Sequence, residues 1–263
     1  ADYVIDRHYP ECRDASRPHA ALLQAVVTRT ARLMAQWQLA GFAHGVMNTD
    51  NFSITGATFD YGPFGFLDAY DPGFICNHSD TSGRYAWNQQ PSIGLWNLNA
   101  LAYALSPLVS REDIVNALQS YEGILLEHYY DGMARKLGLR HYRPDDNQLV
   151  MDLLDLLMKQ GGDYTRTFRG LCQVQAEDRQ CRLRDDFPDR EAFDRWYDRY
   201  RLRLQADQRD DAERQAAMRA VNPKFILRNY LAQIAIRQAE AGDFSEVDRL
   251  MRLLQSPFAE WPE

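Results

Sequence analysis

The residues best suited to chemistry in this sequence are an Asp–Asn pair, Asp50 and Asn51, and a third polar residue, Asp60. Two short apolar runs, 52–54 and 57–59, lie between them on either side of a Thr–Gly turn. This layout predicts a tight β-hairpin that brings Asn51 and Asp60 together. Amide and carboxylate oxygens suit Mg²⁺, which completes its shell with phosphate and water. The stretch therefore predicts a magnesium–phosphate site.

Composition narrows the classes of function. The chain has 263 residues, is 45% hydrophobic and carries a formal charge of −7. An acidic chain lacks the basic face that nucleic acids and anionic membranes attract, so we expect neither as a partner. No apolar run approaches the ~20 residues that span a bilayer, and no signal peptide opens the sequence. Four cysteines without CxxC spacing favour free thiols over zinc or a disulfide scaffold. We expect a cytoplasmic protein.

Helical patterns surround the polar stretch. A helix is predicted from the Ser16–Arg17–Pro18 start signal to Gly41, and it delivers the chain to His44. Apolar periodicity predicts further helices at 93–105, from the cap Ser110 to Gly138, and at 149–158, 164–174, 190–204, 223–241 and 245–254. The charged stretches 175–189 and 207–214 are predicted to be connectors with solvated faces. Aromatic residues of the later helices are assigned to the core.

The predicted fold is mainly α with a short β-hairpin, in a single domain, 1–263. A catalytic and metal-binding loop occupies 42–91, and the helical remainder occupies 92–263. The segment that follows Asp60 has no clear periodicity but holds many aromatic residues, which would be buried if it is ordered. Long irregular segments of this kind are usually functional.

The order of parts matches a known arrangement. The C-terminal lobe of kinase-like folds has the same order of parts: a helix, then His-Gly, then Asn51, then a hairpin, then Asp60-Tyr61-Gly62. In those folds the Asn and the Asp hold the metal ions that bind the phosphates of ATP. Small-molecule kinases of that fold place an Asp directly after His-Gly. Here Val46 stands at that position and cannot accept a proton. Asp50 is the carboxylate that could substitute for it.

Longer stretches carry a more specific resemblance. HGVMNTDN, TFDYGPFGFLDAYDPGFICNHSD, GRYAWNQQP and WNLNALAYALSP resemble the selenoprotein O family of pseudokinases, and GDYTRTFR and NPKFILRNYLAQ extend the likeness weakly. The resemblance implies a protein-kinase-like fold that transfers AMP from ATP to Ser, Thr or Tyr hydroxyls of proteins, with ATP bound in the flipped orientation. By the motif, Asp50 looks like the proton acceptor, Asn51 and Asp60 look like the ligands of Mg²⁺ or Mn²⁺, and Asp60 also lies beside the nucleotide.

Parts of such an enzyme are not visible here. Only 43 residues precede His44, none of them lysine, so the N-terminal lobe with its phosphate-clamping lysine is expected to be absent from this chain. We accordingly expect a C-terminal-lobe fragment with little transferase activity alone. Two alternatives remain open: a small-molecule phosphotransferase, which Val46 disfavours, and a non-catalytic pseudokinase scaffold, which would need no metal ligands. Eukaryotic members of the family are mitochondrial.

Further polar residues have structural explanations that we favour over functional ones. His44 is expected to hold backbone near the loop rather than act as a base. Loop capping is expected of three acidic residues, and substrate or phosphate contact is the less favoured role of two basic ones: Asp68, Asp71, Asp80, His78 and Arg84. Cys76 is expected to be a structural thiol, with redox reactivity as the alternative.

Overall fold

A computed structural model describes residues 1–261 of the chain. The protein is mainly helical, and the strands of the described residues are two short ones, β1 (Phe42–Ala43) and β2 (Gly65–Phe66). The chain divides into two compact units. The first consists of 1–64 and 73–129, and the second of 65–72 and the residues from 130 onward.

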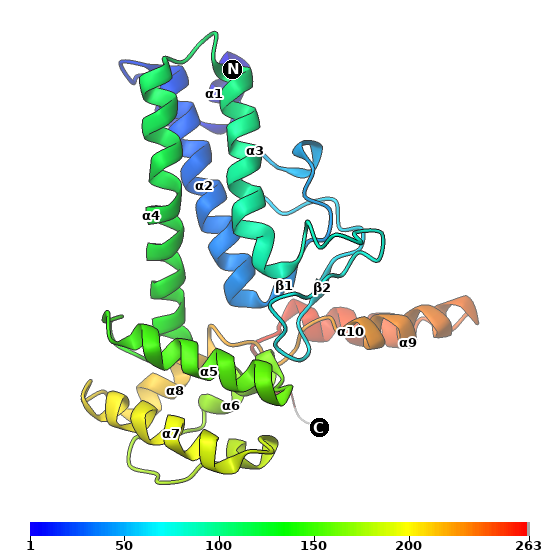
Figure 1. The fold of residues 1–263 in the computed structure, drawn as a ribbon. Helices are drawn as coiled ribbons and strands as arrows, with labels where there is room; N and C mark the ends of the chain where they lie inside the picture. The colour runs from blue at the N-terminus through cyan, green and yellow to red at the C-terminus, as the bar shows by residue number, and fades with distance from the viewer. Residues whose placement is uncertain (262–263) are drawn as a thin grey trace. The chain divides into compact units, whose positions relative to one another are not determined.

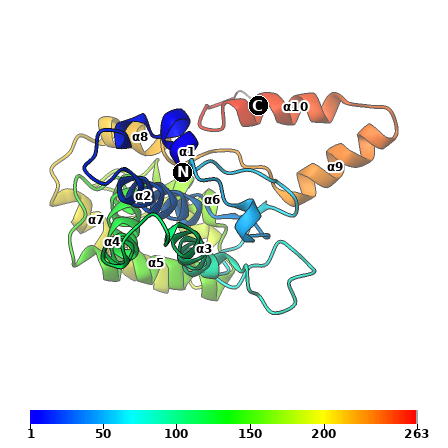
Figure 2. The same cartoon turned by 90° about the horizontal axis from the view of Figure 1, so that it is seen from above.

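The first unit is built on three long helices. These are α2 (Pro18–Ala40), α3 (Gln90–Leu105) and most of α4 (Arg111–Lys136), and they lie side by side in both views (Figures 1 and 2). Shorter elements complete the unit: α1 (Asp2–His8) and the 3-10 turns η1 (Pro10–Cys12), η2 (Thr49–Asn51) and η3 (Trp87–Gln89). The buried residues of α2, including Leu23, Val27 and Met34, form the centre of this core.

A glycine sets how closely these helices pack. A Cβ at Gly94 of α3 would lie 2.9 Å from Met34 Cγ of α2 and 2.8 Å from the Tyr121 hydroxyl of α4. That hydroxyl donates a hydrogen bond to the Pro91 carbonyl at 2.7 Å, close to the start of α3. The three helices therefore meet at a point that admits no side chain on α3.

The second unit has an aromatic core. Its helices are α5 (Asp146–Gln160), α6 (Tyr164–Leu171), α7 (Arg190–Gln205), α8 (Asp211–Arg219), α9 (Asn229–Glu240) and α10 (Ser245–Gln255), with the 3-10 turn η4 (Arg182–Asp186). Buried rings of α7 pack on one another, with Trp196 and Tyr200 stacked at 5.1 Å between centroids. Each also satisfies its polar atom: Trp196 Nε1 donates to the Leu149 carbonyl at 2.9 Å and Tyr200 Oη to the Leu137 carbonyl at 2.8 Å. This packing confirms the prediction that these aromatic residues are core.

Most of the predicted helices are confirmed, with shifted ends. Gly41 ends α2 in a left-handed conformation with φ 68°, as its position predicts. Ser110 Oγ accepts a hydrogen bond from the Asp113 amide at 3.2 Å, as expected of the cap of α4. Arg17 rather than Ser16 stands at the N-cap of α2. The predicted helix 164–174 ends at Leu171, and the predicted helix 223–241 begins only at Asn229.

The predicted hairpin at 52–59 is wrong. The stretch holds no strand, and two of its carbonyl groups accept hydrogen bonds from side chains elsewhere in the chain. The Tyr9 hydroxyl donates to the Ile54 carbonyl, and His44 Nε2 donates to the Phe59 carbonyl at 2.8 Å. Within the stretch the Gly56 amide closes a tight turn on the Ser53 carbonyl at 3.0 Å. The assignment to a kinase-like lobe stays a prediction.

The predicted connector at 207–214 is also corrected, because α8 begins inside it. Asp210 caps this helix by accepting a hydrogen bond from the Glu213 amide at 2.9 Å. The Arg214 side chain is only 2% exposed, and it pairs with Asp211 at 2.7 Å. The charges of this run thus serve a cap and a buried ion pair.

No helix within residues 1–261 combines the length and the apolar character needed to cross a membrane.

Candidate functional site

The candidate site lies in the first unit, where α2 ends and the chain enters an irregular loop. His44 at the base of this loop is 1% exposed and stacks on Trp37, with ring centroids 5.3 Å apart. Its Nδ1 accepts a hydrogen bond from the Val46 amide at 3.4 Å. Because Nε2 donates to the Phe59 carbonyl, the ring is held as the neutral Nε2–H tautomer. His44 therefore has the structural role predicted for it.

Two buried amide side chains fix the path of the loop. Gln90 at the start of α3 is fully buried; its Nε2 donates to the Phe42 carbonyl at 2.8 Å, and its Oε1 accepts from the His44 amide at 2.9 Å. Asn97 Nδ2, two turns further along α3, donates to the Met47 carbonyl at 3.0 Å. Sequence reasoning missed both residues. The signal available was an amide residue at positions where the helical pattern calls for an apolar one.

Asp50 and Asn51 form the end of the loop within the turn η2. Asn51 is half-buried, and its Nδ2 donates to the Val46 carbonyl at 3.1 Å, which fixes the amide plane. The Oδ1 atom, the one that can bind a cation, accepts no hydrogen bond from the described residues. Asp50 is exposed, and its carboxylate makes no hydrogen bond or ion pair within residues 1–261. Both oxygen donors are thus available to a ligand.

Asp60 adopts an uncommon backbone conformation. Its φ is +57°, one of two positive values among the described residues other than glycine, and its carbonyl accepts the Gly62 amide at 2.8 Å. Asp tolerates this left-handed region better than most residues do. The side chain is exposed, and among the described residues it has no hydrogen-bonding or ionic partner. The turn presents the carboxylate to solvent.

Hydrogen bonds join the segment before Asp60 to the framework of the loop. Trp37 Nε1 donates to Thr58 Oγ1 at 2.9 Å, and His44 holds the carbonyl of Phe59. These bonds fix the segment before Asp60 to the buried Trp37–His44 pair. The three candidate side chains, Asp50, Asn51 and Asp60, make no direct contact with one another that would neutralise them.

The donor set fits a hard cation. Within residues 1–261 no group of three His, Cys, Asp or Glu side chains is placed to hold a metal. Mg²⁺ needs only one or two protein carboxylates when substrate phosphates complete its shell. The Oδ1 of Asn51 and the carboxylate of Asp60 are oxygen donors of this kind, and neither is engaged by the described residues.

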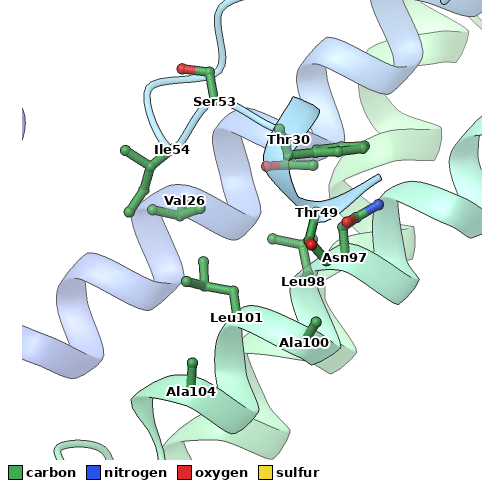
Figure 3. Close-up of a pocket in the computed structure, with 11 residues that line it drawn as sticks. Val26, Thr30, Thr49, Ser53, Ile54, Asn97, Leu98, Ala100, Leu101 and Ala104 are labelled. Carbon is green, nitrogen blue, oxygen red and sulfur yellow. The ribbon is translucent and has the colours of Figure 1, made fainter. Parts of the chain in front are cut away.

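A separate pocket lies behind this loop. It has a volume of about 330 Å³ and lies between α2, α3 and the stretch 49–54 (Figure 3). Its lining is mostly apolar, with Val26, Leu98 and Leu101 among its walls, and includes the polar Thr30, Thr49, Ser53 and Asn97. Asp50, Asn51 and Asp60 do not line it. Its apolar walls do not suit phosphate groups, so this pocket is distinct from the candidate metal site.

The other singled-out residues behave mostly as structural groups. Asp80 accepts hydrogen bonds from the Arg84 amide at 2.9 Å and the Tyr85 amide at 2.7 Å, as predicted for a loop cap. Asp68 belongs to the second unit, where it pairs with Arg228. Burial raises the pKa of Cys76 to about 11, which disfavours the reactive thiolate.

Two of the singled-out residues of the loop 42–91 are exposed basic side chains, His78 and Arg84. His78 is exposed, and the Arg84 guanidinium lies 5.0 Å from the Trp96 ring centroid. Asp71 is exposed as well.

The chain matches the family model "Protein adenylyltransferase SelO" over residues 1–255, and it belongs to that family. A relative called "Protein nucleotidyltransferase YdiU" from Yersinia pseudotuberculosis is 55% identical over 263 residues, all of this chain and 54% of that protein. Its namesake from Myxococcus xanthus is 54% identical over 265 residues, again 54% of that protein. One from Salmonella paratyphi B is 50% identical over 260 residues, which are 99% of this chain and 54% of that protein. The chain thus spans about half the length of the curated relatives it matches.

Proposed function

We propose that the full-length protein transfers AMP from ATP to Ser, Thr or Tyr hydroxyls of proteins, and that this chain supplies the base and the metal ligands. One observation carries the proposal. In a chain of the adenylyltransferase family, the motif residues Asp50 and Asp60 are exposed and Asn51 is half-buried, and the described residues leave the side-chain oxygens of all three unengaged.

The roles follow from the chemistry of the groups. Asn51 and Asp60 would hold Mg²⁺ or Mn²⁺, and the bound metal would supply positive charge that neutralises the phosphates of ATP. The Asp50 carboxylate accepts the proton of the attacking hydroxyl. A bond forms between the hydroxyl oxygen and the α-phosphorus, and the bond from that phosphorus to the β-phosphate bridging oxygen breaks, so pyrophosphate leaves. Asp60 also faces the nucleotide.

Two other functions are weighed against this one. Transfer of the γ-phosphoryl group to a small molecule requires a base in the usual position, where this chain has Val46. A scaffold without catalysis has no use for the pair of metal ligands. The position of Val46 and the unengaged oxygens of Asn51 and Asp60 therefore favour AMP transfer. We place the reaction in the cytoplasm of a bacterium, the kind of organism in which the relatives occur.

The test uses full-length protein with Mg²⁺ and ATP labelled at the α- or the γ-phosphate. We expect label in protein only from α-labelled ATP, and a loss of at least ~100-fold in Asp50→Asn and Asp60→Asn. Asp131→Asn is the matched control, because Asp131 is an exposed carboxylate on α4, outside the loop. Transfer from the γ-label alone would establish a kinase instead. Absence of transfer from either label, with metal-dependent ATP binding also absent, would favour the scaffold.

A further inference from the structure

The segment 77–85 is hydrogen-bonded to the loop 45–51, which carries the candidate base Asp50. Asn77 Nδ2 donates to the Gly45 carbonyl at 3.1 Å, and the Tyr85 hydroxyl donates to Asn48 Oδ1 at 2.6 Å. Asn48 lies directly before η2, the turn that contains Asp50 and Asn51. In the described part of the chain, this phenol is the one side-chain partner of Asn48.

The hydrogen bond to Tyr85 prevents the Asn48 side chain from capping the turn η2. Asn48 stands at the N-cap of η2, where an Asn side chain normally accepts a hydrogen bond from a backbone amide of the turn. No such side-chain cap is formed here. The Oδ1 that would make it is held by Tyr85 instead. Removal of the phenol therefore frees Asn48 to rotate back and bond its own turn, which changes the direction in which that turn presents its side chains.

Tyr85 is itself held in place. The Asp80 carboxylate accepts its backbone amide at 2.7 Å and the Arg84 amide at 2.9 Å, and so closes the turn from which the phenol projects. The Arg84 guanidinium lies 5.6 Å from the Tyr85 ring centroid. Because the ring is half-buried and its backbone is fixed, the Tyr85 side chain loses little conformational entropy when it bonds Asn48.

We propose that Tyr85 is a positioning residue for Asp50 and Asn51, acting through Asn48. The proposal rests on the proposed function in so far as those two residues are the base and a metal ligand. A base or metal ligand displaced by a fraction of an ångström loses much of its effect, because positioning supplies most of the catalysis in phosphoryl-type transfer.

The first experiment compares Tyr85→Phe with Tyr103→Phe in the full-length protein. Phe keeps the ring and removes only the hydroxyl; Tyr103 is 84% exposed on α3, so it serves as the matched control. We expect Tyr85→Phe to lower kcat roughly tenfold, because a displaced base or ligand costs rate, whereas loss of this solvent-exposed bond costs little stability. The Mg²⁺ concentration for half-maximal rate should rise several-fold, while KM for ATP stays within about twofold and the thermal midpoint is unchanged. Tyr103→Phe should match the wild type in all four.

A double-mutant cycle then tests the route through Asn48. Tyr85→Phe should have no further effect on kcat in an Asn48→Ala background, since the bond is already lost. Additive effects of the two substitutions, or a change in KM alone, would overturn the proposal. The outcome is separable from that of the proposed function. Should the wild type transfer only γ-label, the same cycle is measured on that rate, and should it transfer nothing, on the affinity for Mg²⁺·ATP.

Discussion

Substitution of Gly45 by Ala tests how tightly the candidate loop is packed. The φ of Gly45 is +82°, and a Cβ there would lie 2.6 Å from Cys76 Sγ and 3.2 Å from the Pro63 carbonyl oxygen. The left-handed conformation costs a residue with a Cβ roughly 1–2 kcal/mol. Forcing a methyl group into an occupied space adds typically about 1–3 kcal/mol. We expect Gly45→Ala to lower the free energy of unfolding by about 2–5 kcal/mol.

Two other glycines separate the contributions to this loss. Gly161 has φ +66° with no atom within 4 Å of a Cβ, so Gly161→Ala carries the conformational cost alone. Gly62 has neither a left-handed φ nor a neighbour within 4 Å, so Gly62→Ala should be close to neutral. Cys76→Ala in the Gly45→Ala background should recover the part due to the thiol. The assay is urea denaturation of the full-length protein followed by fluorescence. The reasoning is refuted if Gly45→Ala costs no more than Gly161→Ala.

Three further predictions concern buried or half-buried polar groups. Burial lowers the pKa of Lys136 to about 7. Between about pH 7 and 10 the unfolded chain therefore binds more protons than the folded chain, so the free energy of unfolding should rise with pH. Lys136→Met should raise the free energy of unfolding by roughly 2–4 kcal/mol at pH 7 and flatten its rise with pH, as measured by urea denaturation. Arg228 pairs with Asp163 at 2.8 Å and also with Asp68, so Arg228→Met should lower the free energy of unfolding by about 2 kcal/mol, whereas no change in the urea midpoint would show the pairs to be superficial. Gln90→Leu leaves two buried backbone groups unsatisfied and should cost about 2–4 kcal/mol by the same measurement, with a wild-type midpoint as the contrary result.

The helices could be predicted from the sequence because their signals are local. Pro18 and Gly41 mark the two ends of α2, and apolar periodicity sets the course of α5 and α7. The start of α9 at Asn229 was missed because the apolar residues before it continue a helical pattern that the backbone does not follow. Local periodicity cannot show that difference.

The candidate site was predictable only in part. Asp50, Asn51 and Asp60 were found from residue type and motif, and their unengaged oxygens agree with the roles expected of them, which remain proposals. The hairpin predicted between them does not form, and two of its carbonyl groups are bonded instead to the side chains of Tyr9 and His44, residues distant in sequence. Gln90, Asn97 and the rest of the loop framework act through contacts of the same long-range kind. No local pattern encodes them.

Two requirements act on the residue at position 60: a backbone that tolerates a left-handed φ, and a carboxylate for the proposed metal. Asp, Asn and Gly adopt a φ of +57° at modest cost, whereas β-branched and bulky residues do not. If Asp60 binds the metal as we propose, we expect natural variants that need only the turn to carry any of these three residues, and those that need the metal to retain Asp. The residue at this position would then distinguish, within the family, chains that keep a metal site from chains that keep only the backbone turn.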